Sequence, residues 1–233
     1  MIAAALRAAR ALAAPRLSAG HVVLLSFALL LAWDASGLDL PLAFAVGTPH
    51  GFALRDHWLL TTVLHDAGRQ LSWALALALC LGVWWPLGPL TRLPAPRRLQ
   101  LAVSTLAAAF VVSLLKGLNA TSCPWDLSLF GGVAQYASHW SGLADGGPGH
   151  CFPAGHAASG FAFLSGWFAF RHHDRRVAAL WLAAASGTGL LFGISQQLRG
   201  AHFMSHTLWT AWICWTTAWV LDGLHRLFAL REF

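Results

Sequence analysis

The segment CFPAGHAASGFAF, residues 151–163, places a proline, a glycine and a histidine at the mouth of an apolar run. Pro153 is suited to precede a helix, so Ala154, Gly155 and His156 are predicted to form the first turn of that helix. Free N–H groups at a helix N-terminus attract an anion, and Gly155 lets the anion approach the backbone closely. The segment therefore predicts an apolar helix that opens on an anion-binding turn. Metal ligation, core packing and catalysis are all possible roles for its histidine.

The composition of the chain assigns this helix to a membrane. Hydrophobic residues make up 57% of the 233 residues and charged residues only 10%, whereas soluble domains carry about 45–50% and about 25%. A membrane-spanning helix needs about 20 mostly apolar residues. Six runs qualify, at roughly 20–38, 71–90, 99–118, 154–171, 177–195 and 203–223. We therefore expect an all-α polytopic membrane protein with six transmembrane helices, in a single membrane domain over residues 1–233.

Basic residues orient the predicted bundle. The chain has 15 Lys and Arg against 9 Asp and Glu and no nucleic-acid motif, so we interpret its positive charge as a signal of membrane topology. If there are six spans, eleven arginines share one side: Arg7, Arg10, Arg16, Arg92, Arg97, Arg98, Arg171, Arg175, Arg176, Arg226 and Arg231. The opposite side carries Arg55, Arg69, Lys116 and Arg199, within or next to segments 39–70, 117–153 and 196–202.

The positive-inside rule places the eleven arginines and both termini in the cytoplasm. We therefore expect a multi-pass protein of the bacterial inner membrane that contacts the lipid bilayer and binds no nucleic acid. Residues 55–70 are predicted to form an amphipathic helix that lies at the outer interface.

Polar side chains gather at the predicted outer ends of the last four helices. They are Lys116, Asn119, Asp126, His156, Ser195, Arg199, His202 and His206. Because polar and charged groups are costly at this level of a membrane, such a group predicts a functional site. The residue types suit phosphate chemistry: Lys116 and Arg199 can neutralise phosphoryl oxygens. His202 can attack phosphorus, and His156 can protonate the departing oxygen.

Three motifs among these residues resemble those of the type 2 phosphatidic acid phosphatase superfamily, whose integral members have six membrane helices. The family pattern is Lys, six residues, Arg-Pro; then Pro-Ser-Gly-His; then Ser-Arg, five residues, His, three residues, Asp. This chain has Lys116, six residues, Cys123-Pro124; Pro153-Ala154-Gly155-His156; and Ser195-Gln196, five residues, His202, three residues, His206. Order and spacing are kept, within a motif-bearing core at about residues 99–223.

The resemblance implies a metal-independent lipid phosphatase that needs no cofactor. His202 would attack a phosphomonoester or diphosphate of a membrane lipid and become a phosphohistidine, while His156 would serve as acid and then as base. Lys116, Arg199 and the N–H groups near Ala154 and Gly155 would hold the phosphoryl oxygens. The resemblance leaves the lipid open among phosphatidic acid, phosphatidylglycerol phosphate, an undecaprenyl phosphate or diphosphate, and lipid A.

Four positions depart from the family pattern. Cys123 and Gln196 stand in place of arginines, Ala154 in place of the serine and His206 in place of the aspartate. Arg199 can replace one arginine from one turn further on. The missing carboxylate has two possible substitutes: Asp126, or His206 acting directly on His202. Asn119, Ser195 and Gln196 are candidate supporting residues.

Other interpretations stay open. Lys116 can snorkel, Arg199 can anchor the chain at the interface, and Asp126 can make an Asx turn. Cys123 and Cys151 both lie in the predicted outer loop, where an oxidising periplasm favours a disulfide over two free thiols. The same site could serve a lipid phosphotransferase, and the departures also fit a non-catalytic lipid-binding or scaffold protein. A haem or metal protein is disfavoured because no histidine falls in the middle of a predicted span.

Overall fold

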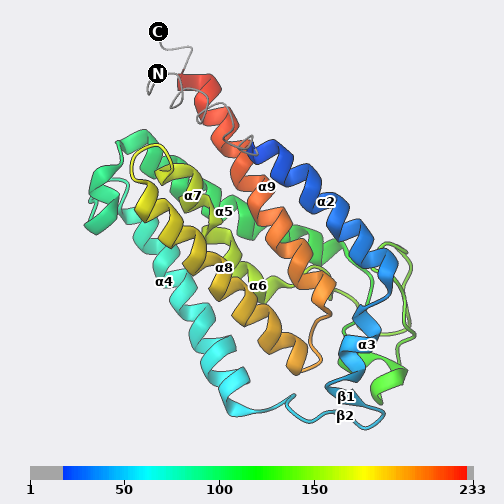
Figure 1. Ribbon diagram of the computed structural model, residues 1–233. Helices are drawn as coiled ribbons and strands as arrows, with labels where there is room; N and C mark the ends of the chain where they lie inside the picture. The colour runs from blue at the N-terminus through cyan, green and yellow to red at the C-terminus, as the bar shows by residue number, and fades with distance from the viewer. Residues whose placement is uncertain (1–17, 230–233) are drawn as a thin grey trace, which may run out of the picture.

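Long helices run side by side in the computed structural model, which describes residues 18–229 (Figure 1). They are α2 (Ala19–Ser36), η1 with α4 (Leu59–Ala67 and Gly68–Leu81), α5 (Ala95–Leu118), α6 with η5 and α7 (Gly155–Phe161, Ala162–Leu164 and Ser165–Phe170), α8 (Arg175–Leu198) and α9 (Met204–Ala229). Three of them, α2, α5 and α8, are long and apolar enough to cross a membrane. The chain is therefore a largely helical, membrane-associated protein, and the six spans stay a prediction.

Local sequence explains where these helices begin and end. The Ser18 hydroxyl accepts the His21 N–H at 3.3 Å before α2, and Gly37 ends that helix at φ 68°, a conformation that favours glycine. The Asp174 carboxylate accepts the N–H groups of Arg176 and Val177 at 3.0 and 3.1 Å, which caps α8. Side-chain caps thus start two of the long helices at the end of the bundle that carries the basic loops.

The separate interfacial helix predicted at residues 55–70 is wrong. Residues 59–67 form a π-helix that continues directly into α4, because Gly68 at the junction keeps helical angles (φ −58°, ψ −43°). Gly68 also lies against α8, where a Cβ would come within 2.7 Å of the Phe192 ring. The amphipathic segment therefore extends the second helix and packs against the bundle. The apolar run at 71–90 ends as a helix at Leu81.

Glycines bring α6, α8 and α9 into close contact. A Cβ at Gly160 would lie 2.2 Å from the backbone nitrogen of Gly189, and one at Gly193 would lie 2.1 Å from Thr207 Cγ2. Small residues allow such close helix approach in membrane proteins. This packing brings the start of α6 beside the start of α9, which are the two places where the histidine motifs lie.

A cap of short elements covers one end of the bundle, at the lower right of Figure 1. It contains α3 (Asp39–Phe44), an antiparallel hairpin of β1 (Gly47–Thr48) and β2 (Gly51–Phe52), and two 3₁₀ turns, η3 (Pro124–Asp126) and η4 (Ser128–Phe130). Phe130 packs between Phe44 and Phe52, with ring centroids 4.9 Å from each. The loops that carry the polar motif residues are thus held by a small apolar core of their own.

The opposite end is tied together by one buried carboxylate. Asp222 in α9 is fully buried and pairs with Arg97 at 2.8 Å, Arg171 at 2.6 Å and Arg226 at 3.2 Å. Arg92 pairs with Asp174 nearby. Arginines predicted to share one side therefore meet at one end of the bundle. Four further members of that predicted set lie outside the described residues: Arg7, Arg10, Arg16 and Arg231.

Candidate active site

The first two motifs meet where α5 ends and α6 begins. A Cβ on Gly155 would lie 3.3 Å from Lys116 Cδ, so the lysine stem runs over the first turn of α6. Ala154 precedes this turn in an extended conformation, and its own N–H donates to the carbonyl of His206 at 3.3 Å. That bond links the second motif to the third. It also engages one of the N–H groups that the sequence assigned to phosphate.

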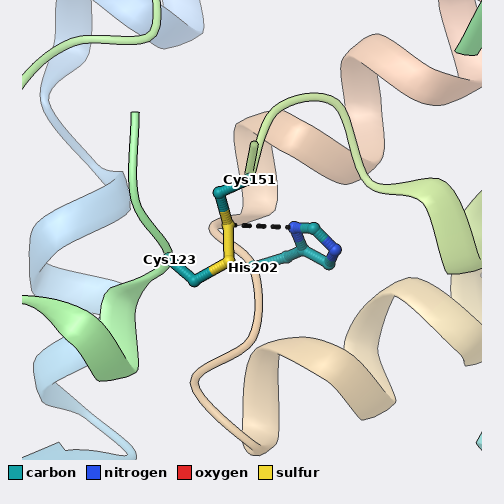
Figure 2. Close-up of side chains that lie close together, drawn as sticks. All are labelled: Cys123, Cys151 and His202. Carbon is teal, nitrogen blue, oxygen red and sulfur yellow. Dashed lines mark hydrogen bonds between the residues drawn. A yellow bond between two sulfur atoms is a disulfide. The ribbon is translucent and has the colours of Figure 1, made fainter. Parts of the chain in front are cut away.

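The third motif places two buried histidines in contact. The Nδ1 atoms of His202 and His206 are 3.3 Å apart, and His202 Nδ1 is also 3.5 Å from the sulfur of Cys151. A disulfide sulfur carries no proton, so a hydrogen bond to it requires the His202 tautomer with Nδ1–H, and in that tautomer His206 Nδ1 can accept from the same group. Figure 2 shows the other ring nitrogen of His202 turned away from the disulfide. In this tautomer that nitrogen, Nε2, keeps its lone pair.

Burial sets the charge state of the predicted nucleophile. It lowers the pKa of His202 well below its ordinary value, and the ammonium of Lys116 lowers it further. A neutral imidazole at pH 7 is the nucleophilic form. The neighbour that faces it is His206, in α9. The hydrogen bonds of Asp126 are backbone ones, to Cys123 and Ala134, and its carboxylate makes none within residues 18–229.

A disulfide joins Cys123 to Cys151, with the two Cα atoms 5.1 Å apart. It links the end of the first motif to the residue two positions before Pro153, as Figure 2 shows. The two sulfurs and a ring nitrogen of His202 lie within 4.8 Å of one another. Metal ligation uses thiolates, and bonded sulfurs do not supply them.

His156 is held by the π-helix. Its Nε2 lies 2.9 Å from the carbonyl of Leu64, and a carbonyl only accepts, so Nε2 carries the proton. The ring packs between those of His65 and Phe192, at 4.6 Å from each. Nδ1 is therefore the nitrogen of His156 that is left for proton exchange with a substrate.

Arg199 faces the outer cap. Its Nε donates to the carbonyl of Arg55 at 2.8 Å, and its Nη1 donates to Gln196 Oε1 at 3.1 Å. Its guanidinium also lies 5.8 Å from the centre of the Trp125 ring. Gln196 in turn donates to the Ser195 hydroxyl at 3.3 Å. These candidate residues form a chain along the end of α8 that is anchored to the cap.

Asn119 joins the outer loop to the end of α5. Its side-chain oxygen accepts from the backbone N–H groups of Thr121 at 3.1 Å and Phe152 at 3.3 Å. Its side-chain nitrogen donates to the carbonyl of His139 at 3.3 Å. The contacts of Asn119 are therefore structural, because they hold the outer loop against the end of α5.

A cavity of about 310 Å³ opens between α4, α5 and α6. Its polar lining includes His65, Arg69, Lys116, Gly155 and His156, and its apolar lining includes Trp73, Leu106 and Phe163. His202 and His206 are not among the described residues that line it. His65 and Arg69 belong to none of the three motifs. Their separation of four residues on a helix, which puts them on one face, was the available signal.

Comparison with known proteins identifies the family. The PAP2 superfamily model matches residues 97–226, which is more than half of the chain and contains all three motifs. No curated protein and no solved structure matches the chain. The match covers the helices that bring Lys116, Gly155 and His202 to one end of the bundle, and on this evidence the chain belongs to the PAP2 superfamily.

Proposed function

We propose that the chain is a metal-independent phosphatase that acts on a phosphorylated membrane lipid through a phosphohistidine on His202. Membership of the PAP2 superfamily indicates phosphatase-type activity on a phosphorylated substrate. The observation that carries the finer proposal is the contact between His202 and His206, 3.3 Å apart and buried beside the disulfide. It leaves a neutral nucleophile oriented by a neighbouring ring.

The proposed reaction has two steps. His202 Nε2 attacks phosphorus and forms a P–N bond as the bond to the leaving oxygen breaks. The leaving oxygen takes a proton from Nδ1 of His156, which has received that proton from the bound phosphate monoanion, while Nε2–H stays on the Leu64 carbonyl. His156 then takes a proton from water as the water attacks the phosphohistidine and the P–N bond breaks. Lys116 and the free N–H groups of the first turn of α6 compensate the charge on the phosphoryl oxygens.

The cavity supports a lipid as substrate. Its polar lining beside Lys116 and His156 suits a phosphorylated head, and its apolar lining along α4 and α5 suits a hydrocarbon tail. If a lipid hydroxyl replaces water in the second step, the same site is a lipid phosphotransferase. The non-catalytic alternative keeps the same fold with lipid binding or scaffolding alone.

Phosphate release from purified lipids tests the proposal. The panel contains phosphatidic acid, phosphatidylglycerol phosphate, undecaprenyl diphosphate and lipid A. We expect His202→Ala to lower turnover at least about 1,000-fold and to remove an acid-labile phosphoenzyme that the wild type forms. His173→Ala, at the end of the bundle with the basic loops, is the matched control and should change neither. Full activity of His202→Ala in a clean preparation would favour the non-catalytic alternative.

The proposed topology has six spans in the bacterial inner membrane, both termini in the cytoplasm and the site in the periplasm. The Cys123–Cys151 disulfide supports an oxidising compartment at the end with the cap, and the arginines that meet at Asp222 support the cytoplasm at the other end. A thiol probe added from outside should modify Leu143→Cys, whose side chain is exposed, and spare His173→Cys. The background is a variant without the free cysteines Cys80 and Cys214. The reverse labelling would overturn this orientation.

A further inference from the structure

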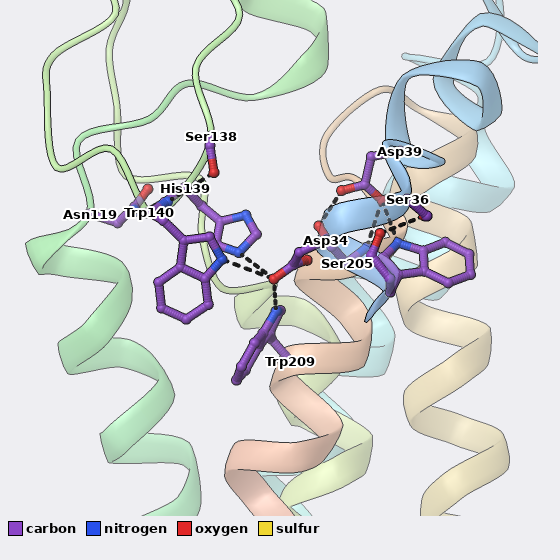
Figure 3. A network of polar contacts seen from close by, with 10 residues as sticks. Asp34, Ser36, Asp39, Asn119, Ser138, His139, Trp140, Ser205 and Trp209 are labelled. Carbon is purple, nitrogen blue, oxygen red and sulfur yellow. Dashed lines mark hydrogen bonds and ion pairs between the residues drawn. The ribbon is translucent and has the colours of Figure 1, made fainter. Parts of the chain in front are cut away.

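A second carboxylate network lies next to the histidine pair, and it comes from outside the three motifs. Asp34 is at the end of α2, and its Oδ2 accepts the indole N–H groups of Trp140 at 2.9 Å and Trp209 at 3.0 Å. The same oxygen is 3.3 Å from Nε2 of His139, as Figure 3 shows. Two indole N–H groups therefore donate to one carboxylate oxygen, and the His139 ring lies at ion-pair distance from the same oxygen without a hydrogen bond to it.

His139 links this carboxylate to the third motif. Its ring stacks on Phe152 at 4.1 Å, with 11° between the planes, and meets the ring of His206 edge to face at 5.8 Å. Phe152 also packs against His206, at 5.3 Å. The side chains of Asp34 and His139 are only 12% and 8% exposed. The four side chains Asp34, His139, His206 and His202 therefore form one continuous buried row.

The electrostatics of the row suit a histidine nucleophile. Burial lowers the pKa of His139, although the nearby Asp34 carboxylate raises it, so His139 is neutral at pH 7, with its Nε2 3.3 Å from Asp34 Oδ2. Attack on phosphorus leaves the His202 ring with a positive charge. His206 can accept the His202 Nδ1–H, but a neutral imidazole brings no negative charge of its own. Within the described residues, Asp34 has no Lys or Arg partner, so an uncompensated negative charge lies at one end of the row.

We propose that Asp34 and His139 are positioning residues that act through His206 on the nucleophile and together replace the carboxylate that His206 displaced. This inference rests on the proposed function. Asp34 orients the His139 ring, His139 and Phe152 hold the His206 ring, and the carboxylate charge favours the cationic phosphohistidine. The neighbouring Asp39 does other work: it accepts the backbone N–H of Ser205 at 3.0 Å and fixes the start of α9.

The test is an epistasis experiment on the full chain in detergent, with phosphatidic acid and p-nitrophenyl phosphate as probes. We expect Asp34→Asn and His139→Ala each to lower kcat by about ten- to a hundredfold with KM little changed, since they support the transition state and not binding. Asp145→Asn is the control. Asp145 ties the same loop to Ser122 and Gly147 and does not contact the row, so kcat per folded protein should stay unchanged.

The decisive variant is His206→Asp, which gives His202 a carboxylate directly. In that background Asp34→Asn should change kcat less than about twofold, because the substitute is no longer needed. An equal loss of kcat in both backgrounds would mean that Asp34 only supports the fold. A rise in KM at constant kcat would lead to the same conclusion. If the wild type releases no phosphate from either probe or from any lipid of the panel used to test the proposed function, that function fails. The inference is then decided by side-chain ¹⁵N resonances: Asp34→Asn must shift those of His206 and leave His65 unmoved, and an unmoved His206 would overturn it.

Discussion

Each end of the bundle contains a buried carboxylate on or beside α9, and the two are compensated in opposite ways. Asp222 is surrounded by guanidinium groups, with Arg97 at 2.8 Å, Arg171 at 2.6 Å and Arg226 at 3.2 Å. Asp34 at the other end is held by two indole N–H groups and a histidine. One carboxylate is outnumbered by positive charge, and the other keeps its own charge among neutral donors.

This difference distinguishes a carboxylate with a structural role from the one that we propose supports catalysis. The arginines on Asp222 come from α5, the turn after α7, and α9. The cluster therefore joins three parts of the chain, and losing Asp222 should destabilise their packing. Neutral donors can hold Asp34 in place without cancelling its field, which leaves that field available to a charge that develops in a reaction. The comparison predicts that losing Asp222 lowers the free energy of unfolding and that losing Asp34 lowers turnover.

The largest expected effect is that of Asp222→Ala. It leaves the largely buried guanidinium groups of Arg97 and Arg171 without a carboxylate partner, which typically costs about 3–5 kcal/mol of the free energy of unfolding. Thermal and denaturant unfolding in detergent measures the loss, and phosphatase activity per folded protein should be retained. Asp174→Asn is the control, because its pair with the exposed Arg92 is worth about 1 kcal/mol or less and asparagine preserves the cap of α8. An inactive Asp222→Ala protein of normal stability would break the comparison.

The disulfide should give the next effect, at the outer end. Cys123 and Cys151 are 28 residues apart, and closing a loop of that length contributes about 3–4 kcal/mol in the chain-entropy model. A reductant should lower the unfolding midpoint of the wild type and leave a Cys123→Ser/Cys151→Ser variant unaffected, with Cys80→Ser as the control for thiol chemistry. Activity should fall too, because the sulfur of Cys151 contacts His202 Nδ1. If the reductant leaves the unfolding midpoint of the wild type unchanged, the disulfide does not stabilise the outer end.

The apolar pattern predicted most of the long helices, and the motifs predicted that Lys116 lies beside Gly155 and His202 beside His206. Both succeed because hydrophobic runs and helix-end residues are local properties of the sequence. The prediction of an interfacial helix was wrong for a physical reason. An amphipathic segment that continues through Gly68 without a helix break can either lie on a membrane or extend a neighbouring helix. Packing against Phe192 decides between these two arrangements.

The two carboxylate networks were beyond sequence reasoning. Asp34 and His139 come from an apolar run and an irregular loop, and no period or spacing relates them. Arg97 and Arg171 look like solvated loop charges until the fold brings Asp222 between them. From the sequence, Asp126 was as good a candidate as His206 for orienting His202, since distance along the chain says nothing about where a carboxylate points. Such residues become visible only when loops and distant helices are packed.

The smallest expected effect is that of Arg199→Ala, although the sequence assigned this residue to the phosphate. Its guanidinium already donates to the Arg55 carbonyl and to Gln196, on the side of the cap. Losing these bonds should cost about 1 kcal/mol of stability and change kcat less than about threefold. Lys116→Ala is the comparator, because Lys116 lines the cavity beside Gly155 and should cost about 100- to 1,000-fold in kcat, as the loss of one oxyanion donor does. Equal losses for the two variants would mean that Arg199 leaves the cap and reaches the phosphoryl group when substrate binds. The outer end would then contain a mobile cation as well as a fixed carboxylate, and its contrast with the closed arginine cluster around Asp222 would be greater still.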